Sequence, residues 1–190
     1  MAIEDRRARE RAARRQLIVD TARALAEAEG WDAVTTRRLS HEIEYSQPVL
    51  YKHFHGMDQI AEAVAVEGFG ELTHALTAAR ETATSARDAL TGIAQRYLGF
   101  ARAHPALYDA MFTRATTLRF AAQETPPALR AAFDELRGAV ADVTDGRDPD
   151  DLTEVFWSAL HGLAVLDRGR RIRPGRATER IAILVDQTCS

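Results

Sequence analysis

The chain has 190 residues, of which 46% are hydrophobic, and a formal net charge of −3. This length and composition favour one or two folded domains and exclude a disordered protein. The single cysteine, Cys189, excludes an intrachain disulfide and a cysteine-based zinc site, and it favours the reducing cytoplasm. The longest strongly apolar run, residues 181–185, is too short to span a bilayer. The charged N-terminal residues do not resemble a signal peptide.

Charge is distributed unevenly along the chain. Residues 1–57 hold 10 basic and 9 acidic residues, and residues 58–190 hold 15 basic and 19 acidic residues. Residues 1–15 alone contain six arginines and three acidic residues. A basic end on an acidic body is typical of a DNA-binding head carried by a larger regulatory body. A solvated, arginine-rich helix start would explain the same charge pattern.

Apolar residues at helical spacing, with little alternation of β-branched residues, predict an all-α protein of about nine helices. The expected helices are, in chain order: 8–29, ended by Gly30; a short helix capped by Thr35 or Thr36; another capped by Ser46 and ended at 55–56; 58–79, containing Gly68 and Gly70; 86–104; 106–113; 127–143; a helix to residue 168 capped by Asp148; and 177–188. Residues 114–125 give no clear pattern.

Residues 35–54 carry the most informative pattern in the chain. Leu39 and Ile43 repeat at four-residue spacing before a short break, and Leu50 and Phe54 repeat in the same way after it. Two short apolar helices on either side of a tight turn predict a helix-turn-helix, whose second helix enters the major groove of DNA. The only lysine in the chain, Lys52, lies in that second segment.

The run TTRRL at 35–39, followed by QPVLYKHF at 47–54, resembles the DNA-binding head of the tetracycline-repressor (TetR) family. The resemblance covers about residues 10–65. It implies a three-helix N-terminal head, residues 1–56, and a helical effector-binding and dimerisation domain, residues 57–190. It also implies a repressor that a small, largely apolar molecule releases from DNA. Further along, Trp157, His161 and Gly162 resemble the tryptophan-histidine-glycine (WHG) signature of one C-terminal subgroup.

Three positions depart from the family pattern and bear on how the head docks on DNA. The turn is usually a small residue, glycine and valine, whereas here it is Ile43-Glu44-Tyr45. Glu44 carries a conformational cost if its φ is positive, and Tyr45 is bulkier than the usual valine. Met57 replaces a lysine that commonly contacts phosphate in the family.

The candidate DNA contacts lie on both helices of the motif: Thr36, Arg37, Gln47, Pro48, Val49, Tyr51, Lys52 and His53. Thr36 and Arg37 lie at a helix N-terminus, which binds phosphate, and Arg37 is also a candidate for a guanine edge, which arginine prefers. The next four are candidates for base edges, and the last two for phosphates. Surface exposure alone would also explain Arg37, and packing would explain Tyr51. Leu50 and Phe54 are expected to be core residues.

Three further features of the head are less specific. His53 and His55 have a spacing seen at metal sites, but no third ligand lies nearby in sequence, so neither a metal site nor a cofactor is predicted. The arm at residues 6–15 is a candidate for phosphate or minor-groove contact, and disorder is its alternative. Two heads on a symmetric dimer would read a palindromic operator.

An aromatic-rich part of the body is the candidate effector site, lined by Tyr97, Phe100, His104, Tyr108, Met111, Phe112, Phe133, Trp157 and His161. Few polar tips among many apolar side chains suit a pocket for an apolar ligand. Core packing explains the same residues without a ligand. His104 and His161 are candidates for a hydrogen bond to a ligand or for sensing pH.

Apolar residues at helical spacing in the last two helices predict a homodimer interface: Leu152, Val155, Phe156, Ala159, Gly162, Leu163, Leu166, Ile181, Leu184 and Val185. Packing within one chain is the alternative for part of this surface. Gly68 and Gly70 are expected to let the helix between head and body bend. Two other functions stay open: a helical adaptor, or a small helical enzyme. For the enzyme there is no phosphate loop, metal cluster or nucleophile with a base, and the chain is predicted not to be one.

Overall fold

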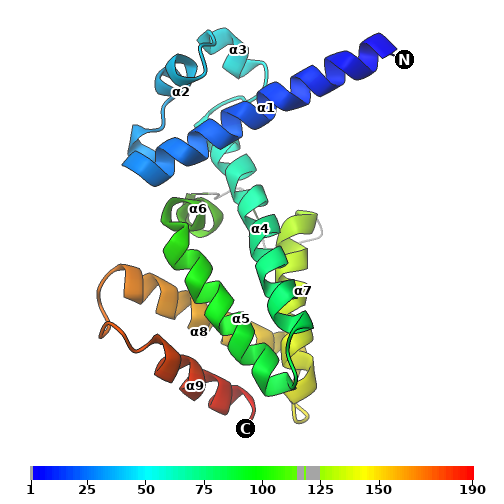
Figure 1. Ribbon diagram of the computed structural model, residues 1–190, viewed down its shortest axis with the longest axis vertical. Helices are drawn as coiled ribbons and strands as arrows, with labels where there is room; N and C mark the ends of the chain where they lie inside the picture. Colours follow the sequence, from blue (N-terminus) through cyan, green and yellow to red (C-terminus); the bar gives the residue numbers. More distant parts are fainter. Residues whose placement is uncertain (1, 115–117, 119–124) are drawn as a thin grey trace. The chain divides into compact units, whose positions relative to one another are not determined.

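The computed structural model describes residues 2–114, 118 and 125–190. Every regular element within these residues is helical, as Figure 1 shows, which confirms the predicted all-α class. The predicted bounds of α5 (Ala86–Ala103), α8 (Pro149–Arg168) and α9 (Ala177–Thr188) agree with the structure to within one residue. Most of the segment 114–125 lies outside the described residues. No helix in the described part of the chain has the length and apolar character needed to cross a membrane.

The chain forms two compact units. The first comprises Met1–Gly68 and His104–Arg119, and the second comprises Phe69–Ala103 and Phe120–Ser190. The break between them falls within the long helix α4 (Met57–Glu81). These units are groups of residues that pack together. The predicted boundary between residues 56 and 57 instead separates a DNA-binding domain from an effector-binding and dimerisation domain, and it stays a prediction.

The first unit is built on α1 (Ala2–Glu29), which begins six residues earlier than the sequence predicted. Its C-terminal half packs with α2 (Thr36–Glu42), and α2 in turn packs with α3 (Gln47–Tyr51). The core of this unit consists of large apolar side chains that are almost fully buried, among them Ile18, Leu39, Leu50, Phe54 and Ile60. The predicted start at residue 8 was wrong because residues 2–7 are mostly polar and carry no apolar repeat.

The short helix α6 (Pro105–Asp109) belongs to the first unit, although it lies far from α1 in sequence. The Glu27 carboxylate accepts hydrogen bonds from the backbone N–H groups of Ala106 (3.0 Å) and Leu107 (2.9 Å). The Trp31 indole N–H donates to the Ala106 carbonyl at 2.8 Å. Glu27 thereby satisfies two free N–H groups at the start of α6 and attaches this helix to the end of α1. A turn of π-helix, Ala110–Arg114, follows α6.

Gly68 allows α4 and α6 to approach closely. A Cβ atom at this position would lie 2.8 Å from Leu107 Cδ1 and 2.8 Å from Met111 Sδ, and both side chains are buried. At Gly70 a Cβ atom would meet no atom within 4 Å. Gly68 therefore has a packing role that the sequence did not predict, and the bending role of both glycines stays a prediction.

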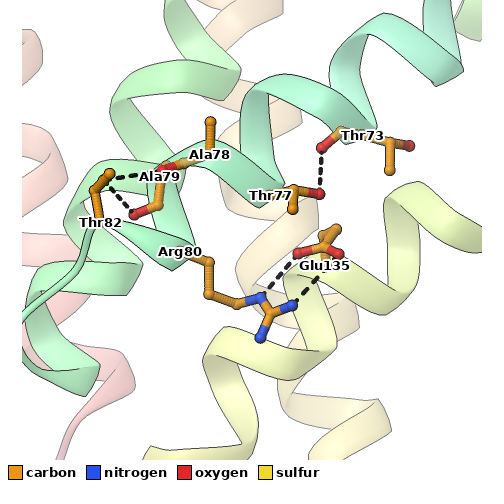
Figure 2. Close-up of polar contacts among 7 residues, drawn as sticks. All are labelled: Thr73, Thr77, Ala78, Ala79, Arg80, Thr82 and Glu135. Carbon is orange, nitrogen blue, oxygen red and sulfur yellow. Dashed lines mark hydrogen bonds and ion pairs between the residues drawn. The ribbon is translucent and has the colours of Figure 1, made fainter.

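The second unit contains α5, α7 (Pro127–Val140), α8, α9 and the rest of α4. Asp148 caps α8 as predicted, accepting hydrogen bonds from the N–H groups of Asp150 (2.8 Å) and Asp151 (3.0 Å). Figure 2 shows Arg80 of α4 reaching Glu135 of α7, with Nε 2.8 Å from Oε2. This ion pair joins two helices that are distant in sequence.

Candidate nucleic-acid interface

The turn between α2 and α3 contains a non-glycine residue with positive φ, as the sequence comparison with the family pattern suggested. Glu44 has φ 55°, in the left-handed region, where a non-glycine residue costs about 1–2 kcal/mol. The Tyr45 N–H donates to the Ser40 carbonyl at 3.0 Å, and the Tyr45 side chain is half-buried. The turn therefore forms without the usual glycine and valine, at a conformational cost carried by Glu44.

Each helix of the motif begins at its predicted cap, but only one cap forms its side-chain bond. The Thr35 hydroxyl accepts from the Arg38 N–H at 3.1 Å. Ser46 occupies the cap position of α3 without a side-chain cap bond. α3 ends at Tyr51, earlier than the predicted end at 55–56. Backbone bonds from residues 52–54 back to the carbonyls of residues 49 and 50 continue the chain as turns, so Lys52 and His53 follow directly on α3.

All eight candidate DNA contacts are exposed or half-buried. Tyr51 is 49% exposed, so its ring is available to a partner, whereas packing would have buried it. Leu50 and Phe54 are 1% and 2% exposed, which confirms them as core residues. α3 thus buries one side within the head and presents the other to solvent.

The two neighbouring arginines of α2 differ in their surroundings. Arg38 pairs with Glu42 (2.8 Å) on its own helix and with Glu29 (3.1 Å) at the end of α1. Arg37 is exposed. Arg38 therefore links α2 to α1, and Arg37 is the arginine of this pair that is available to a ligand.

The end of α3 lies in a cationic environment. Burial lowers the pKa of His53 below 6.5, and four nearby cations lower it further: Arg14, Arg15, Arg11 and Lys52. Arg15 donates from Nη1 to the His53 carbonyl at 3.3 Å, and its guanidinium lies 4.1 Å from the centre of the Phe54 ring. The sequence placed Arg15 in a basic arm but gave no sign of this contact with residues 38 positions away. Among the described residues, no three His, Cys, Asp or Glu side chains are grouped to hold a metal ion.

The candidate effector residues divide between the two units. Five belong to the second unit: Tyr97, Phe100, Phe133, Trp157 and His161. Four belong to the first unit: His104, Tyr108, Met111 and Phe112. Their common role in one effector site stays a prediction.

In the second unit the Trp157 indole N–H donates to the buried Tyr97 hydroxyl at 3.0 Å. Burial also lowers the pKa of His161. In the first unit the ring centres of Tyr108 and Phe112 are 4.6 Å apart. A groove of about 550 Å³ in the second unit has a lining that the sequence did not predict: Gly70, Glu71, His74, Ala75, Ala78 and Arg96.

The candidate dimer residues fall into two sets. Four are buried in the core of their own chain and are removed from the predicted interface: Leu152, Phe156, Ile181 and Val185. Helical spacing alone could not separate these from residues on the outer face. Six remain exposed or half-buried: Val155, Ala159, Gly162, Leu163, Leu166 and Leu184.

Five of these six line a groove of about 350 Å³ formed by α8 and α9. The groove also contains Ile183, which is 57% exposed and which the sequence analysis missed. The six exposed or half-buried candidates and Ile183 form the apolar outer face of α8 and α9, which is called the α8–α9 face below.

Comparison with known proteins supplies the class. The model of bacterial regulatory proteins of the tetR family matches residues 18–64, and a model of the tetracyclin repressor-like C-terminal domain matches residues 90–187. The HTH-type transcriptional regulator Rv0681 of Mycobacterium tuberculosis is 32% identical over 162 residues, which cover 80% of this chain and 69% of that protein. The helix-turn-helix and these matches define a DNA-binding transcriptional regulator. The chain belongs to the TetR family.

Solved structures agree with this fold. A protein of unknown function from Rhodococcus sp. RHA1 is similar with a TM-score of 0.78 and 26% identity, covering 92% of this chain and 93% of that chain. RolR in complex with resorcinol is similar with a TM-score of 0.70 and 16% identity, covering 95% and 89% of the two chains. Members of the family are regulators rather than enzymes.

Proposed function

We propose that this protein is a homodimeric repressor that binds a palindromic operator and is released by a small, largely apolar molecule. The observation that carries the DNA-binding part is the solvent-facing side of α2 and α3. Eight polar, aromatic or small apolar side chains are accessible there, while Leu50 and Phe54 fix α3 from the other side. A helix held in this way can enter the major groove without rearranging.

The proposed roles follow from the chemistry of each side chain. Thr36 and Arg37, at the start of α2, bind phosphate, and Arg37 also reaches a guanine edge. Gln47 pairs with adenine, and the ring of Tyr51 packs against a thymine methyl group. Pro48 and Val49 make similar apolar contacts, and Lys52 and His53 bind phosphate. Residues 1–56 act as the DNA-binding domain, and residues 57–190 bind the effector and dimerise.

We assign dimerisation to the α8–α9 face. Val155 and Leu166, which are 64% and 38% exposed, leave a large apolar area facing solvent. The small residues Ala159 and Gly162 let a partner helix approach closely. A symmetric dimer would present two heads to half-sites about 34–36 Å apart, or a multiple of this distance.

The effector proposal rests on the family and on the second unit's aromatic residues. RolR, which shares the fold, was solved with resorcinol, a small aromatic molecule. In this chain the Trp157–Tyr97 pair offers an indole and a phenol; Phe100 lies on the same helix as Tyr97, and Phe133 lies on α7, which packs with α5 and α8. The proposed site is therefore the second unit's five candidate residues.

Selection of bound duplexes from random DNA tests the DNA-binding proposal. The proposal predicts enriched sequences with two-fold symmetry. Asymmetric sequences would contradict a dimer, and no enrichment together with binding that is insensitive to salt would favour a helical adaptor.

Sedimentation velocity tests the dimer. Ile183→Asp places a charge in the groove of the α8–α9 face and should convert the dimer to monomer. Leu17→Asp, at another exposed apolar residue, is the matched control and should remain dimeric. If both variants sediment as dimers, the α8–α9 face is not the dimer interface.

Tryptophan fluorescence tests the effector site. The chain has two tryptophans, so Trp31→Phe leaves Trp157 as the only indole reporter. Resorcinol is the first probe. Saturable quenching, accompanied by weaker DNA binding, would support the site, whereas ligand-induced release from DNA with unchanged Trp157 emission would place the effector elsewhere.

A further inference from the structure

The N-terminal half of α1 is a largely solvent-exposed helix, and its contacts with the rest of the head begin near Arg15. Residues 4–17 are exposed throughout, and burial begins only at Ile18. Fourteen helical residues extend about 21 Å. Figure 1 shows this part of α1 projecting past α3. A polar helix of this length contributes nothing to the core, so a role outside the core is the simplest reason for it.

One face of this projecting helix is cationic. Arg7, Arg11 and Arg14 are spaced four and three residues apart, which places them on one side of the helix. The same spacing continues to Ile18 and Leu25, which are buried against the rest of the head. The three arginines therefore lie on the side of α1 that is buried within the head further along the helix. This set is called the α1 arginine stripe.

The position of His53 agrees with this direction. Both Arg11 and Arg14 are close enough to lower the pKa of His53, at the end of α3. Arg15 fixes the distance between α1 and the end of α3, because it donates to the His53 carbonyl and lies over the Phe54 ring. α1 is thus held beside α3, and its cationic side continues the surface proposed to bind DNA.

The other arginines of the projecting helix have local partners. Arg6 pairs with Glu10 at 3.7 Å, and Arg9 donates to the Asp5 carbonyl at 3.3 Å. Among the described residues, no ion pair joins the α1 arginine stripe to an acidic side chain. The stripe therefore keeps its full charge for an external anion.

We propose that the α1 arginine stripe is a second DNA-binding surface, which binds backbone phosphates flanking the base pairs that α3 reads. This rests on the proposed function of the head. Duplex DNA presents one negative charge per about 1.7 Å of axis, so a cationic helix beside α3 meets several phosphates. Guanidinium groups bind phosphate in a bidentate manner. A membrane surface is disfavoured, because residues 4–16 contain no large apolar side chain to insert.

Two matched double variants separate the stripe from the remaining charge of the arm. Arg7→Gln with Arg11→Gln removes two stripe arginines, and Arg6→Gln with Arg9→Gln removes the same charge from other faces. Glutamine is nearly as good a helix former as arginine, so circular dichroism should show equal helix content. Binding is measured by fluorescence anisotropy over a salt series, on a selected operator and on a long random duplex.

In the stripe variant, the plot of log K against log salt should become less steep, by about 0.9 for each phosphate that the removed arginines neutralise in the wild-type complex. This change is expected on both duplexes. The control variant should keep the wild-type slope. On an operator trimmed of its flanking base pairs, the difference between wild type and the stripe variant should disappear.

Equal slopes for wild type and both variants, with intact operator binding, would overturn this inference and leave the proposed function standing. Equally reduced slopes in the two variants would also overturn it, since only the net charge would then matter. A wild-type protein without salt-dependent binding to any selected duplex would reject the proposed function itself and this inference with it.

Discussion

Gly68→Ala is the substitution whose effect the structure defines most sharply. The added Cβ would lie 2.8 Å from Leu107 Cδ1 and Met111 Sδ, roughly 0.7 Å inside the usual contact distance. Leu107 and Met111 are 0% and 1% exposed, so neither side chain can swing into solvent. Overpacking of this kind costs about 1–3 kcal/mol, while alanine gains about 1 kcal/mol over glycine within a helix. We expect a net loss of up to about 2 kcal/mol in the free energy of unfolding.

Gly70→Ala is the matched control on the same helix. Its Cβ meets no atom within 4 Å, so only the helix-propensity gain remains, and the variant should be stabilised by about 0.5–1 kcal/mol. Urea unfolding at one fixed protein concentration measures both variants, because dimerisation makes stability depend on concentration. If Gly68→Ala proves as stabilising as Gly70→Ala, the close contact of α4 with α6 is not tight, and the packing role assigned to Gly68 is wrong.

Three further predictions concern single side chains. Glu27→Gln leaves one acceptor oxygen for two N–H groups of α6 and removes the charge, so the free energy of unfolding should fall by about 1–2 kcal/mol, as measured by urea denaturation; an unchanged value would show that α6 does not depend on this cap. Arg80→Lys removes the second, 3.5 Å hydrogen bond to Glu135 and should cost less than about 1 kcal/mol, with the cost shrinking at high salt; a salt-independent cost would point to packing instead. Burial lowers the pKa of His161 below 6.5, so its protonation opposes folding, and stability should decline as pH falls from about 6.5 towards the folded-state pKa. His161→Gln should flatten that part of the profile, and an equally steep decline in the variant would assign it to other groups.

Local signals in the sequence located most of the helices. Asp148 followed by proline and two acids marked the start of α8, because a cap and its dipole partners lie within one turn. α9 matched its predicted bounds, since its apolar repeat fills the whole helix. The start of α1 was missed because a helix without an apolar face leaves no periodic signal. α3 was predicted too long, because the turns after Tyr51 keep the spacing of a helix without its regular bonds.

Contacts between distant residues were beyond sequence reasoning. Nothing near Glu27 indicates that its carboxylate caps a helix almost eighty residues away. Arg15 gave no sign of its place beside His53, because only folding brings α1 to the end of α3. Gly68 fits a bend and a close contact equally well until its neighbours are known. The exposure of the candidate DNA contacts was easier to predict, because they lie on one short motif whose exposed side follows from its buried side; their contact with DNA stays a prediction.

The central claim is that the exposed side of α2 and α3 binds DNA, and anisotropy with Tyr51→Ala and Lys52→Ala tests it most directly. The operator recovered by selection and a random duplex are each titrated over a salt series. Tyr51→Ala should reduce the preference for the operator while the salt slope stays at the wild-type value, since an apolar base contact releases no counterions. Lys52→Ala should weaken binding to both duplexes by the same factor, and it should make the salt slope less steep by about 1 for each head. If both variants keep the wild-type preference and slope, α3 does not contact DNA, and the binding surface lies elsewhere on the protein.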